Sequence, residues 1–321
     1  MNSLIRFSQA AAGKRQHSGE WPFMPIPVLF DTDIGSDIDD AVALAYLLRQ
    51  PECDLLGITT VSGEPEKRAA LARAVCGAAG RDDVPVHAGL EAPLVAALLQ
   101  PHAPQAQALD LAAFAEFSQP TAINFLRETI RARPGEITLL ATGPLTNLAV
   151  LFALDPEVPA LLKQMVLMGG VFYTRSVGHT GATGAEWNMR CDPHAAAIVF
   201  RAPVPRLLAV GLDVTEQCRM PAEKVRIRFT AAGPPLDMVL DMAEVWFRQT
   251  PQITFHDPLA AALIFAPELC QTERQRVEVD TSHSRTQGQT FFEPNAGEKP
   301  HEIAVSVEAP AFFQHYFEVV A

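Results

Sequence analysis

The sequence has few cysteines, no long apolar run and a deficit of positive charge. Its five cysteines are scattered, odd in number and never spaced C-x-x-C, which excludes a disulfide framework and predicts a reducing, cytoplasmic location. No run of about 18 apolar residues is present, so we expect no membrane-spanning segment and no membrane partner. The 25 lysines and arginines against 37 aspartates and glutamates give a formal net charge of −12. Such a balance argues against a nucleic acid polymer as partner, because phosphate binding relies on basic side chains, whereas a nucleoside carries no phosphate.

The first 25 residues differ from the rest of the chain. They are polar after one early arginine and lack a secretory signal pattern. We expect residues 1–25 to form a loosely ordered arm. No repeat or linker interrupts the following residues, so residues 26–321 are predicted to be one catalytic domain.

Short apolar runs alternate with helical patterns through most of the chain. Strands are expected at residues 26–30, 56–61, 84–88, 137–142, 165–168 and 207–212. Helices are expected at residues 41–49, 66–79, 122–131, 145–152 and 194–200. This order predicts an α/β fold with an open, mostly parallel central sheet flanked by helices.

Three further segments depart from that alternation. After Cys270, strand patterns at residues 277–280, 290–292 and 303–307 predict a β-rich C-terminal tail. Residues 101–120 are rich in alanine, glutamine and proline and predict a loop-and-helix excursion. Residues 175–185 are rich in glycine and threonine and predict a mobile loop near the site.

Five aspartates crowd the ten residues that follow the first expected strand, in the segment VLFDTDIGSDIDDAVAL. Carboxylates at this density repel one another unless a cation neutralises them. Oxygen ligands alone suit a hard ion, either Ca²⁺ or Mg²⁺. A solvated acidic loop with one aspartate capping a helix is the alternative, but capping accounts for only one or two of the five. The aspartates are Asp31, Asp33, Asp37, Asp39 and Asp40.

Three known types of metal site can be compared with this loop. The EF-hand requires glycine at the sixth place and glutamate at the twelfth, where this chain has Ser36 and Val42. A haloacid-dehalogenase-type phosphatase also begins D-x-D after a strand, but it expects threonine or valine where Ile34 stands and does not need the pair Asp39–Asp40.

The third type fits best, because DTDIGSDIDDAVAL resembles the D-x-D-P-G-x-D-D-A loop of the inosine-uridine-preferring nucleoside hydrolase family. Further segments similar to that family occur in the family order between residues 26 and 265. They are ITTVSG, ATGPLTNLA, VLMGG, AEWNMRCDPHAA, VGLDVT and HDPLA.

The resemblance implies hydrolysis of the N-glycosidic bond of ribonucleosides to ribose and free base by metal-bound water. It implies a Ca²⁺ held by Asp33, Asp40, the Thr142 carbonyl and Asp257, with Asp37 as an alternative ligand. Asp33 is also implied as the general base, because a carboxylate beside the bound water can take its proton. A homodimer or homotetramer is expected.

The resemblance also implies a shell of residues around the nucleoside. Asp39 and Asp257 are expected at the ribose hydroxyls, and His256 is expected to assist the departing base. Without the resemblance, a lone histidine is more often structural, and the segment around E-W-N could be an ordinary surface loop. The remaining implied ribose contacts are Met168, Glu186 and Asn188.

This chain departs from the family pattern at several positions. The aspartate loop is two residues longer than usual, which leaves open whether Asp37 or Asp39 contacts the ribose. Glu64 stands where the family commonly has asparagine after V-x-G, and it would add a negative charge near the ribose; Thr180 replaces another expected asparagine. These changes motivate a second hypothesis, a ribose- or nucleoside-binding protein with little turnover. A Mg²⁺-dependent phosphatase built on Asp31 and Asp33 is a third.

Overall fold

An eight-stranded sheet crosses the molecule, and the acidic loop lies at the carboxyl end of one of its central strands. The computed structural model describes residues 24–111, 121–173, 184–282, 285–293 and 296–321. In the order in which they lie side by side, the strands are β3 (Val86–Ala88), β2 (Cys53–Thr60), β1 (Ile26–Thr32), β4 (Thr138–Ala141), β5 (Gln164–Met168), β6 (Leu207–Val210), β12 (His301–Val307) and β9 (Cys270–Gln275). Every neighbouring pair is parallel except β12 and β9, which are antiparallel.

The central strands are apolar because both of their faces are buried. In β1, Val28, Leu29 and Phe30 are fully buried. Val28 and Phe30 belong to the apolar core on one face of the sheet, and Leu29 belongs to the core on the other. Continuous apolar runs are typical of parallel strands that are covered on both sides.

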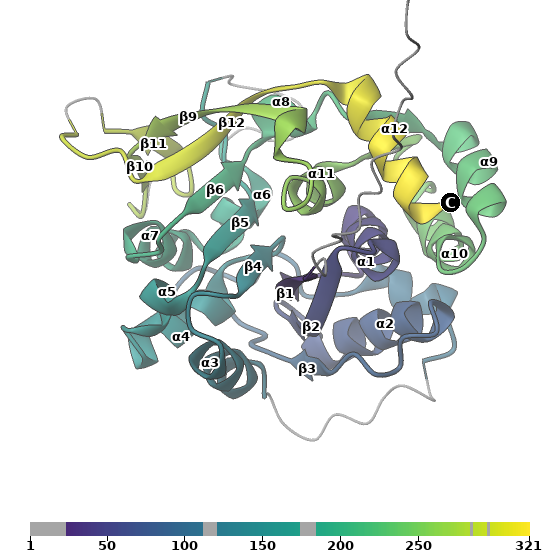
Figure 1. The fold of residues 1–321 in the computed structure, drawn as a ribbon, viewed down its shortest axis with the longest axis horizontal. Helices are drawn as coiled ribbons and strands as arrows, with labels where there is room; N and C mark the ends of the chain where they lie inside the picture. Colours follow the sequence, from purple (N-terminus) through teal and green to yellow (C-terminus); the bar gives the residue numbers. More distant parts are fainter. Residues whose placement is uncertain (1–23, 112–120, 174–183, 283–284, 294–295) are drawn as a thin grey trace, which may run out of the picture.

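Helices cover the two faces of the sheet (Figure 1). On one face lie α3 (Ala122–Ala132), α4 (Thr146–Leu154), α5 (Val158–Leu161) and α7 (Pro193–Arg201), which share a core with Leu29. On the other lie α1 (Asp39–Arg49), α2 (Pro65–Ala78), α11 (His256–Ala262) and α12 (Ala309–Val320), whose core includes Val28. Beyond them, α9 (Ala222–Ala232) and α10 (Leu236–Trp246) extend the second core.

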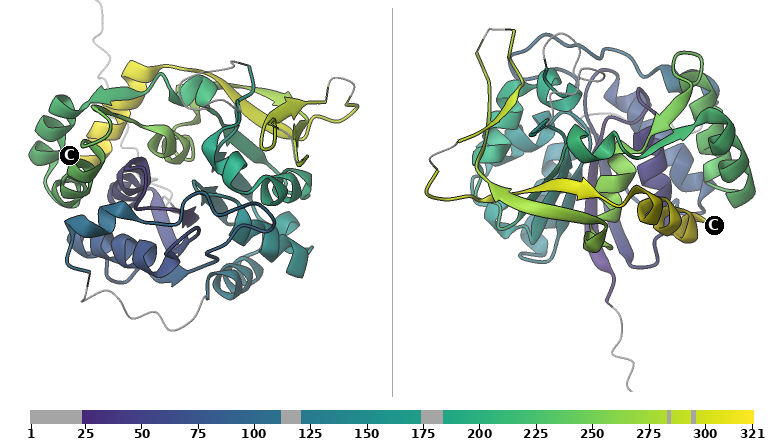
Figure 2. Two further views of the ribbon diagram at one scale, coloured as in Figure 1. Left: turned by 180° about the vertical axis from the view of Figure 1, so that it is seen from behind. Right: turned by 90° about the horizontal axis from the view of Figure 1, so that it is seen from above.

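Short elements complete the described part of the chain. The strands β10 (Val277–Val279) and β11 (Thr290–Phe292) pair antiparallel, as do β7 (Arg219–Pro221) and β8 (Gln252–Thr254). Figure 2 shows β10 and β11 at the opposite end of the molecule from α9 and α10. The remaining elements are α6 (Trp187–Cys191), α8 (Leu212–Thr215) and the 3₁₀ helices η1 (Pro104–Ala108) and η4 (Pro267–Leu269).

The expected α/β fold with a largely parallel sheet is confirmed. The β-rich tail is present, but β12 joins the main sheet and the chain then ends in helix α12, which the strand patterns did not predict. The sixth expected strand is shorter than expected, because β6 ends at Val210 and Leu212 begins α8. The expected N-terminal arm lies outside the described residues except for its last two. The expected mobile loop also lies outside the described residues except for Gly184 and Ala185. Thr180 is therefore outside the described residues as well.

The order of the strands fixes where a ligand can bind. The chain passes from β1 to β2 and β3 on one side and then returns to β4 on the other side of β1. Such a reversal opens a crevice at the carboxyl ends of the two strands. Asp33 follows β1 and Thr142 follows β4 at this point. Within the described ranges, no helix combines the length and apolar composition needed to cross a bilayer.

Candidate active site

A cavity of about 640 Å³ lies over the carboxyl ends of the central strands. It is lined by side chains from widely separated parts of the sequence. Of the residues expected at the site, the structure brings all but Glu64 to this cavity. They are Asp33, Asp37, Asp39, Asp40, Thr142, Met168, Glu186, Asn188, His256 and Asp257.

The two aspartates of the D-x-D segment lie in different surroundings. Asp33 lines the cavity, where its Oδ2 accepts a hydrogen bond of 2.5 Å from Gln100 Nε2. Asp31 does not line the cavity. Its Oδ1 accepts hydrogen bonds from Thr59 Oγ1 (2.5 Å) and Asn147 Nδ2 (2.8 Å) instead. Its Oδ2 is buried without a hydrogen-bond partner, and burial raises the pKa of Asp31 to about 7.

Asp40 is held in place by two hydroxyl groups. Thr32 Oγ1 and, at 2.9 Å, Thr142 Oγ1 both donate to Asp40 Oδ1, which leaves Oδ2 for a cation. The turn after β4 approaches this loop so closely that it requires glycine. A Cβ on Gly143 would lie 3.0 Å from the Asp33 Oδ1 and 2.8 Å from a methyl group of Val61.

Three buried carboxylates converge beside Asp33. Asp39, Asp40 and Asp257 each offer an oxygen within 4.8 Å of those of the other two. Asp39 Oδ2 accepts a hydrogen bond of 3.1 Å from the Asp257 backbone N–H, so the start of α1 meets the start of α11. This trio contains Asp39 where the expected ligand set had Asp33.

Burial and mutual repulsion dominate the electrostatics of these acids. Burial raises the pKa of Asp39, Asp40 and Asp257 well above the ordinary value, and the neighbouring carboxylates raise it further. The pKa of Asp33 is also raised by burial, although Arg68 and the Gln100 hydrogen bond act in the opposite direction. Groups this costly to ionise together fit a site that binds a divalent cation through oxygen ligands.

The E-x-N pair lies at the start of α6 with distinct roles for its two side chains. Glu186 caps the helix, because Oε1 accepts from Asn188 N (2.8 Å) and Oε2 from Met189 N (3.1 Å) and Gly170 N (3.2 Å). Asn188 Nδ2 donates to the Thr142 carbonyl (2.6 Å) and the Met168 carbonyl (3.2 Å). The pair therefore joins β4, β5 and α6 around the cavity.

His256 stands at the first position of α11, directly before Asp257. It is 6% exposed, lines the cavity, and its Nδ1 lies 2.7 Å from Thr215 Oγ1. Thr215 closes α8, the turn that follows β6. The hydroxyl fixes the orientation of the imidazole ring.

Glu64 does not line the cavity, unlike the other expected residues. Its carboxylate accepts hydrogen bonds from Lys67 Nζ (2.5 Å) and the Ala103 backbone N–H (2.9 Å). The hydrogen bond from Lys67 holds the pKa of the Glu64 carboxyl below its ordinary value. Contrary to the expectation, the residue anchors the chain after Gln100 instead of adding charge at the ribose position.

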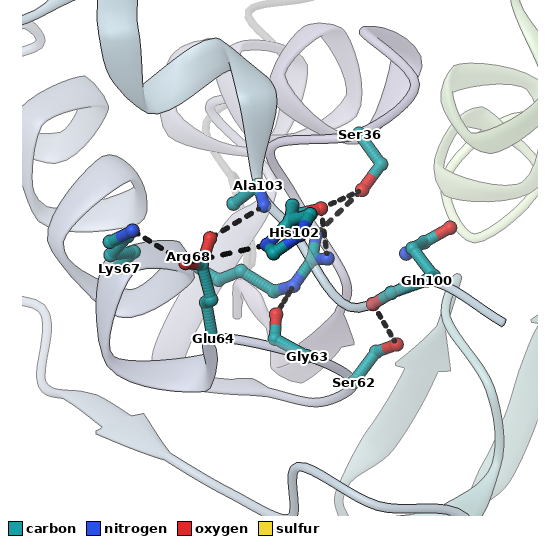
Figure 3. A network of polar contacts seen from close by, with 9 residues as sticks. All are labelled: Ser36, Ser62, Gly63, Glu64, Lys67, Arg68, Gln100, His102 and Ala103. Atoms are coloured by element: carbon teal, nitrogen blue, oxygen red, sulfur yellow. Dashed lines mark hydrogen bonds and ion pairs between the residues drawn. The ribbon is translucent and has the colours of Figure 1, made fainter. Parts of the chain in front are cut away.

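Arg68 is a fully buried cation next to the aspartate loop. Its NH1 donates to the carbonyls of Asp33 and Ile34, the latter at 3.2 Å. Its Nε donates to the Gly63 carbonyl (2.7 Å) and its NH2 to the His102 carbonyl (3.0 Å), as Figure 3 shows. One guanidinium therefore ties three separate segments together.

Several residues of the cavity wall carried no sequence signal. Pro101, His102 and Pro104 belong to residues 101–120, whose composition predicted only a loop and helix, and Gln100 directly precedes them. Trp187 lay inside the E-W-N motif without an assigned role. The rest of the wall comes from Ser36, Leu212, the end of α10 (Val245 and Trp246) and Gln249, which follows that helix.

Comparisons with known proteins agree with this geometry. A model of the family described as inosine-uridine preferring nucleoside hydrolase matches residues 28–314. The chain is 34% identical over 310 residues to the pyrimidine-specific ribonucleoside hydrolase RihA of Citrobacter koseri, covering 90% of this chain and 96% of that protein. A plant nucleoside hydrolase structure, PpNRh1, has a TM-score of 0.81 at 26% identity and covers 92% of this chain and 99% of its own. The structure of a purine-preferring ribonucleoside hydrolase from Gardnerella vaginalis has a TM-score of 0.79 at 25% identity, covering 92% and 98% respectively.

Proposed function

The chain belongs to the inosine-uridine preferring nucleoside hydrolase family and is a nucleoside hydrolase, an N-glycosidase, and we propose that it hydrolyses ribonucleosides with Asp33 as the general base. The observation that carries the proposal is the convergence of Asp33, Asp39, Asp40 and Asp257 in one buried cavity. We further propose pyrimidine ribonucleosides as the preferred substrates. This preference rests on the RihA relative, which is similar to this chain over 90% of its length.

The donor set fits a calcium ion. Asp40, Asp257, Asp33 and the Thr142 carbonyl are the proposed ligands, with Asp39 or Asp37 close by. Hard carboxylate and carbonyl oxygens are the ligands that calcium takes in proteins. When bound, such an ion lowers the pKa of a coordinated water and fixes its position.

Asp33 is proposed to take the proton of the attacking water. It is buried, faces the cavity, and has a carboxylate held in one orientation by Gln100. A carboxylate in this position is a competent base once a neighbouring cation favours its ionised form.

The ribose is proposed to lie against Asp39, Asp257, Asn188, Glu186 and the Met168 backbone. All five residues line the cavity, and their polar groups are buried. Polar groups that lose a hydroxyl partner in a buried site cost free energy. The site is therefore expected to reject 2′-deoxyribonucleosides.

His256 is proposed to assist the departing base. Its Nδ1 contacts Thr215, which orients the ring toward the cavity that it lines. With the base Asp33 and the leaving-group residue supplied by separate elements, direct displacement by water inverts the configuration at C1′.

The two alternative functions receive less support. In a phosphatase of the D-x-D kind the first aspartate must reach the substrate as nucleophile, but Asp31 is engaged by Thr59 and Asn147 outside the cavity. A binding protein with little turnover was motivated by Glu64, which binds Lys67 and does not line the cavity.

The test is release of free ribose by the purified protein with calcium. Uridine and cytidine are expected to be cleaved faster than inosine, and deoxyuridine not at all. Asp33→Ala should lower kcat by more than about 100-fold, the scale of lost acid–base assistance. Asp54→Ala, at an exposed ion pair with Arg133, is the control and should retain activity. Absence of ribose from every ribonucleoside, or full activity of Asp33→Ala, would contradict the proposal.

The cytoplasmic location and the homodimeric or homotetrameric state also belong to the proposal. The first rests on the five cysteines, none of which is paired in the structure. Sedimentation of the purified protein measures the second directly.

A further inference from the structure

We propose that Gln100 is a positioning residue for Asp33 and that Trp187 acts through Gln100 by holding its amide in one orientation. The inference rests on the proposed role of Asp33 as the general base. Gln100 lies on the segment between β3 and η1, far in sequence from both partners. Neither it nor Trp187 belongs to the ligand set or to the ribose shell proposed above.

Two hydrogen bonds define the arrangement. Gln100 Nε2 donates to Asp33 Oδ2 at 2.5 Å, and Trp187 Nε1 donates to Gln100 Oε1 at 2.7 Å. The indole N–H is only a donor, so its partner must be the amide oxygen of Gln100. The amide NH₂ group is then compelled to face Asp33, where it can only donate.

The backbone of Gln100 is held just as firmly. Its carbonyl accepts from Ser62 Oγ at 3.4 Å, and a Cβ on Gly63 would lie 2.5 Å from the same oxygen, so only glycine allows this approach. Two residues further on, the His102 carbonyl accepts from Arg68 NH2 at 3.0 Å, and Glu64 binds the Ala103 N–H at 2.9 Å. Figure 3 shows these contacts.

Gln100 and Trp187 differ in their exposure to solvent. Gln100 is 9% exposed, whereas Trp187 is 41% exposed at the rim of the cavity, where Arg190 lies 5.8 Å from its ring. The amide is therefore buried, although the indole that binds it is partly exposed. A misplaced general base costs turnover more than substrate binding, because its contribution depends on orientation.

The main experiment compares Gln100→Met with the wild-type protein at saturating calcium. Methionine has a similar size but cannot donate a hydrogen bond. We expect kcat for uridine to fall about tenfold or more while KM changes less than about threefold. Gln164→Met is the matched control, because Gln164 is also 9% exposed and its side chain donates a hydrogen bond to Thr138 and accepts one from Arg206 at the start of β5. It should retain wild-type kcat.

A double-mutant cycle tests the connection through Trp187. Trp187→Phe keeps an aromatic ring but removes the N–H, and it should lower kcat about threefold or more. On the Gln100→Met background the same change should alter kcat by less than about twofold, because the hydrogen bond from residue 100 to Asp33 is already absent. Independent, multiplying losses would overturn the role assigned to Trp187.

A second substitution at Gln100 keeps the test from depending on the methionine variant alone. Gln100→Glu keeps the acceptor for Trp187 but loses the donor and sets a carboxylate against Asp33, so it should lose turnover as Gln100→Met does. Wild-type kcat in both variants, or a raised KM with unchanged kcat, would overturn the proposal. Because the wild-type protein and Asp33→Ala are measured beside them, the two failures are distinguishable. Without ribose release by the wild type the proposed function fails, whereas an active wild type and an inactive Asp33→Ala isolate a failure at Gln100.

Discussion

Two aspartates separated by a single residue have opposite surroundings in this structure. Asp33 faces the cavity, while Asp31 is fully enclosed and bound to Thr59 and Asn147. The sequence segment D-x-D does not distinguish them, because alternation along a strand ends where the loop begins. Only the neighbouring strand β2 and helix α4, which supply Thr59 and Asn147, distinguish the enclosed Asp31 from Asp33, the proposed general base.

Asp31→Asn is expected to stabilise the metal-free protein at high pH. Because burial raises the pKa of Asp31 from 3.8 to about 7, ionisation at pH 8 costs folding free energy that the amide does not. We expect the free energy of unfolding to rise by about 1–3 kcal/mol at pH 8 and to change little at pH 4, where the acid is protonated. Urea denaturation at both pH values measures this, with the exposed Asp54→Asn as control. An equal change at the two pH values would contradict the prediction.

His256→Ala should slow cleavage most where the leaving base is poor. The imidazole lines the cavity and is oriented by Thr215, but an activated leaving group needs no such assistance. We expect kcat for uridine to fall about 100-fold and kcat for a nitrophenyl riboside to fall less than about tenfold. Steady-state kinetics with both substrates provides the comparison. Equal losses would assign His256 to structure.

At the scale of elements, the buried guanidinium of Arg68 holds together the loops that form the site. Arg68 on α2 binds the carbonyls of Asp33, Gly63 and His102 and so joins the ends of β1 and β2 to the segment after β3. Its burial lowers its pKa, whereas Asp33 and Asp40 act to raise it. The helical pattern predicted α2, but nothing in that pattern identified Arg68 as an inward-facing residue.

Arg68→Met should destabilise the fold strongly. The substitution leaves several buried carbonyl oxygens without donors, so we expect the free energy of unfolding to fall by about 3 kcal/mol or more. Arg226→Met is the control, since Arg226 forms an exposed ion pair with Glu244 and should cost less than about 1 kcal/mol. Both are measured by urea denaturation with calcium present. A loss at Arg68 no larger than that at Arg226 would show that the network contributes little.

For the whole molecule, the cluster of raised pKa values links stability to pH and, through the proposed metal site, to calcium. In the unfolded chain the aspartates lose their protons near their ordinary pKa of 3.8, whereas the folded metal-free protein keeps them to higher pH. Between those values the folded state binds more protons, so its stability falls as the pH rises. A bound cation favours the ionised carboxylates and opposes this loss.

We therefore expect chelation to matter more at pH 8 than at pH 5. The Tm of the chelator-treated protein should decrease as the pH rises over this range, and added calcium should restore it mainly at pH 8. Differential scanning calorimetry with and without calcium measures both effects, with magnesium as a comparison ion. A calcium-induced rise in Tm that is larger at pH 5 would contradict the assignment of these acids to a cation site.

The sequence by itself determined the α/β class, the parallel strands and the acidic loop, because these depend on local periodicity and on residues adjacent in the chain. Its motif order also indicated the family. Tertiary structure decided which acids meet, since Asp39 and Asp257 lie 218 positions apart and are joined only by the contact of α1 with α11. It also engaged Glu64 with Lys67 and the Ala103 N–H outside the cavity lining and brought Gln100 to Asp33. Such pairings depend on where loops return to the sheet, and no local pattern of residues specifies that.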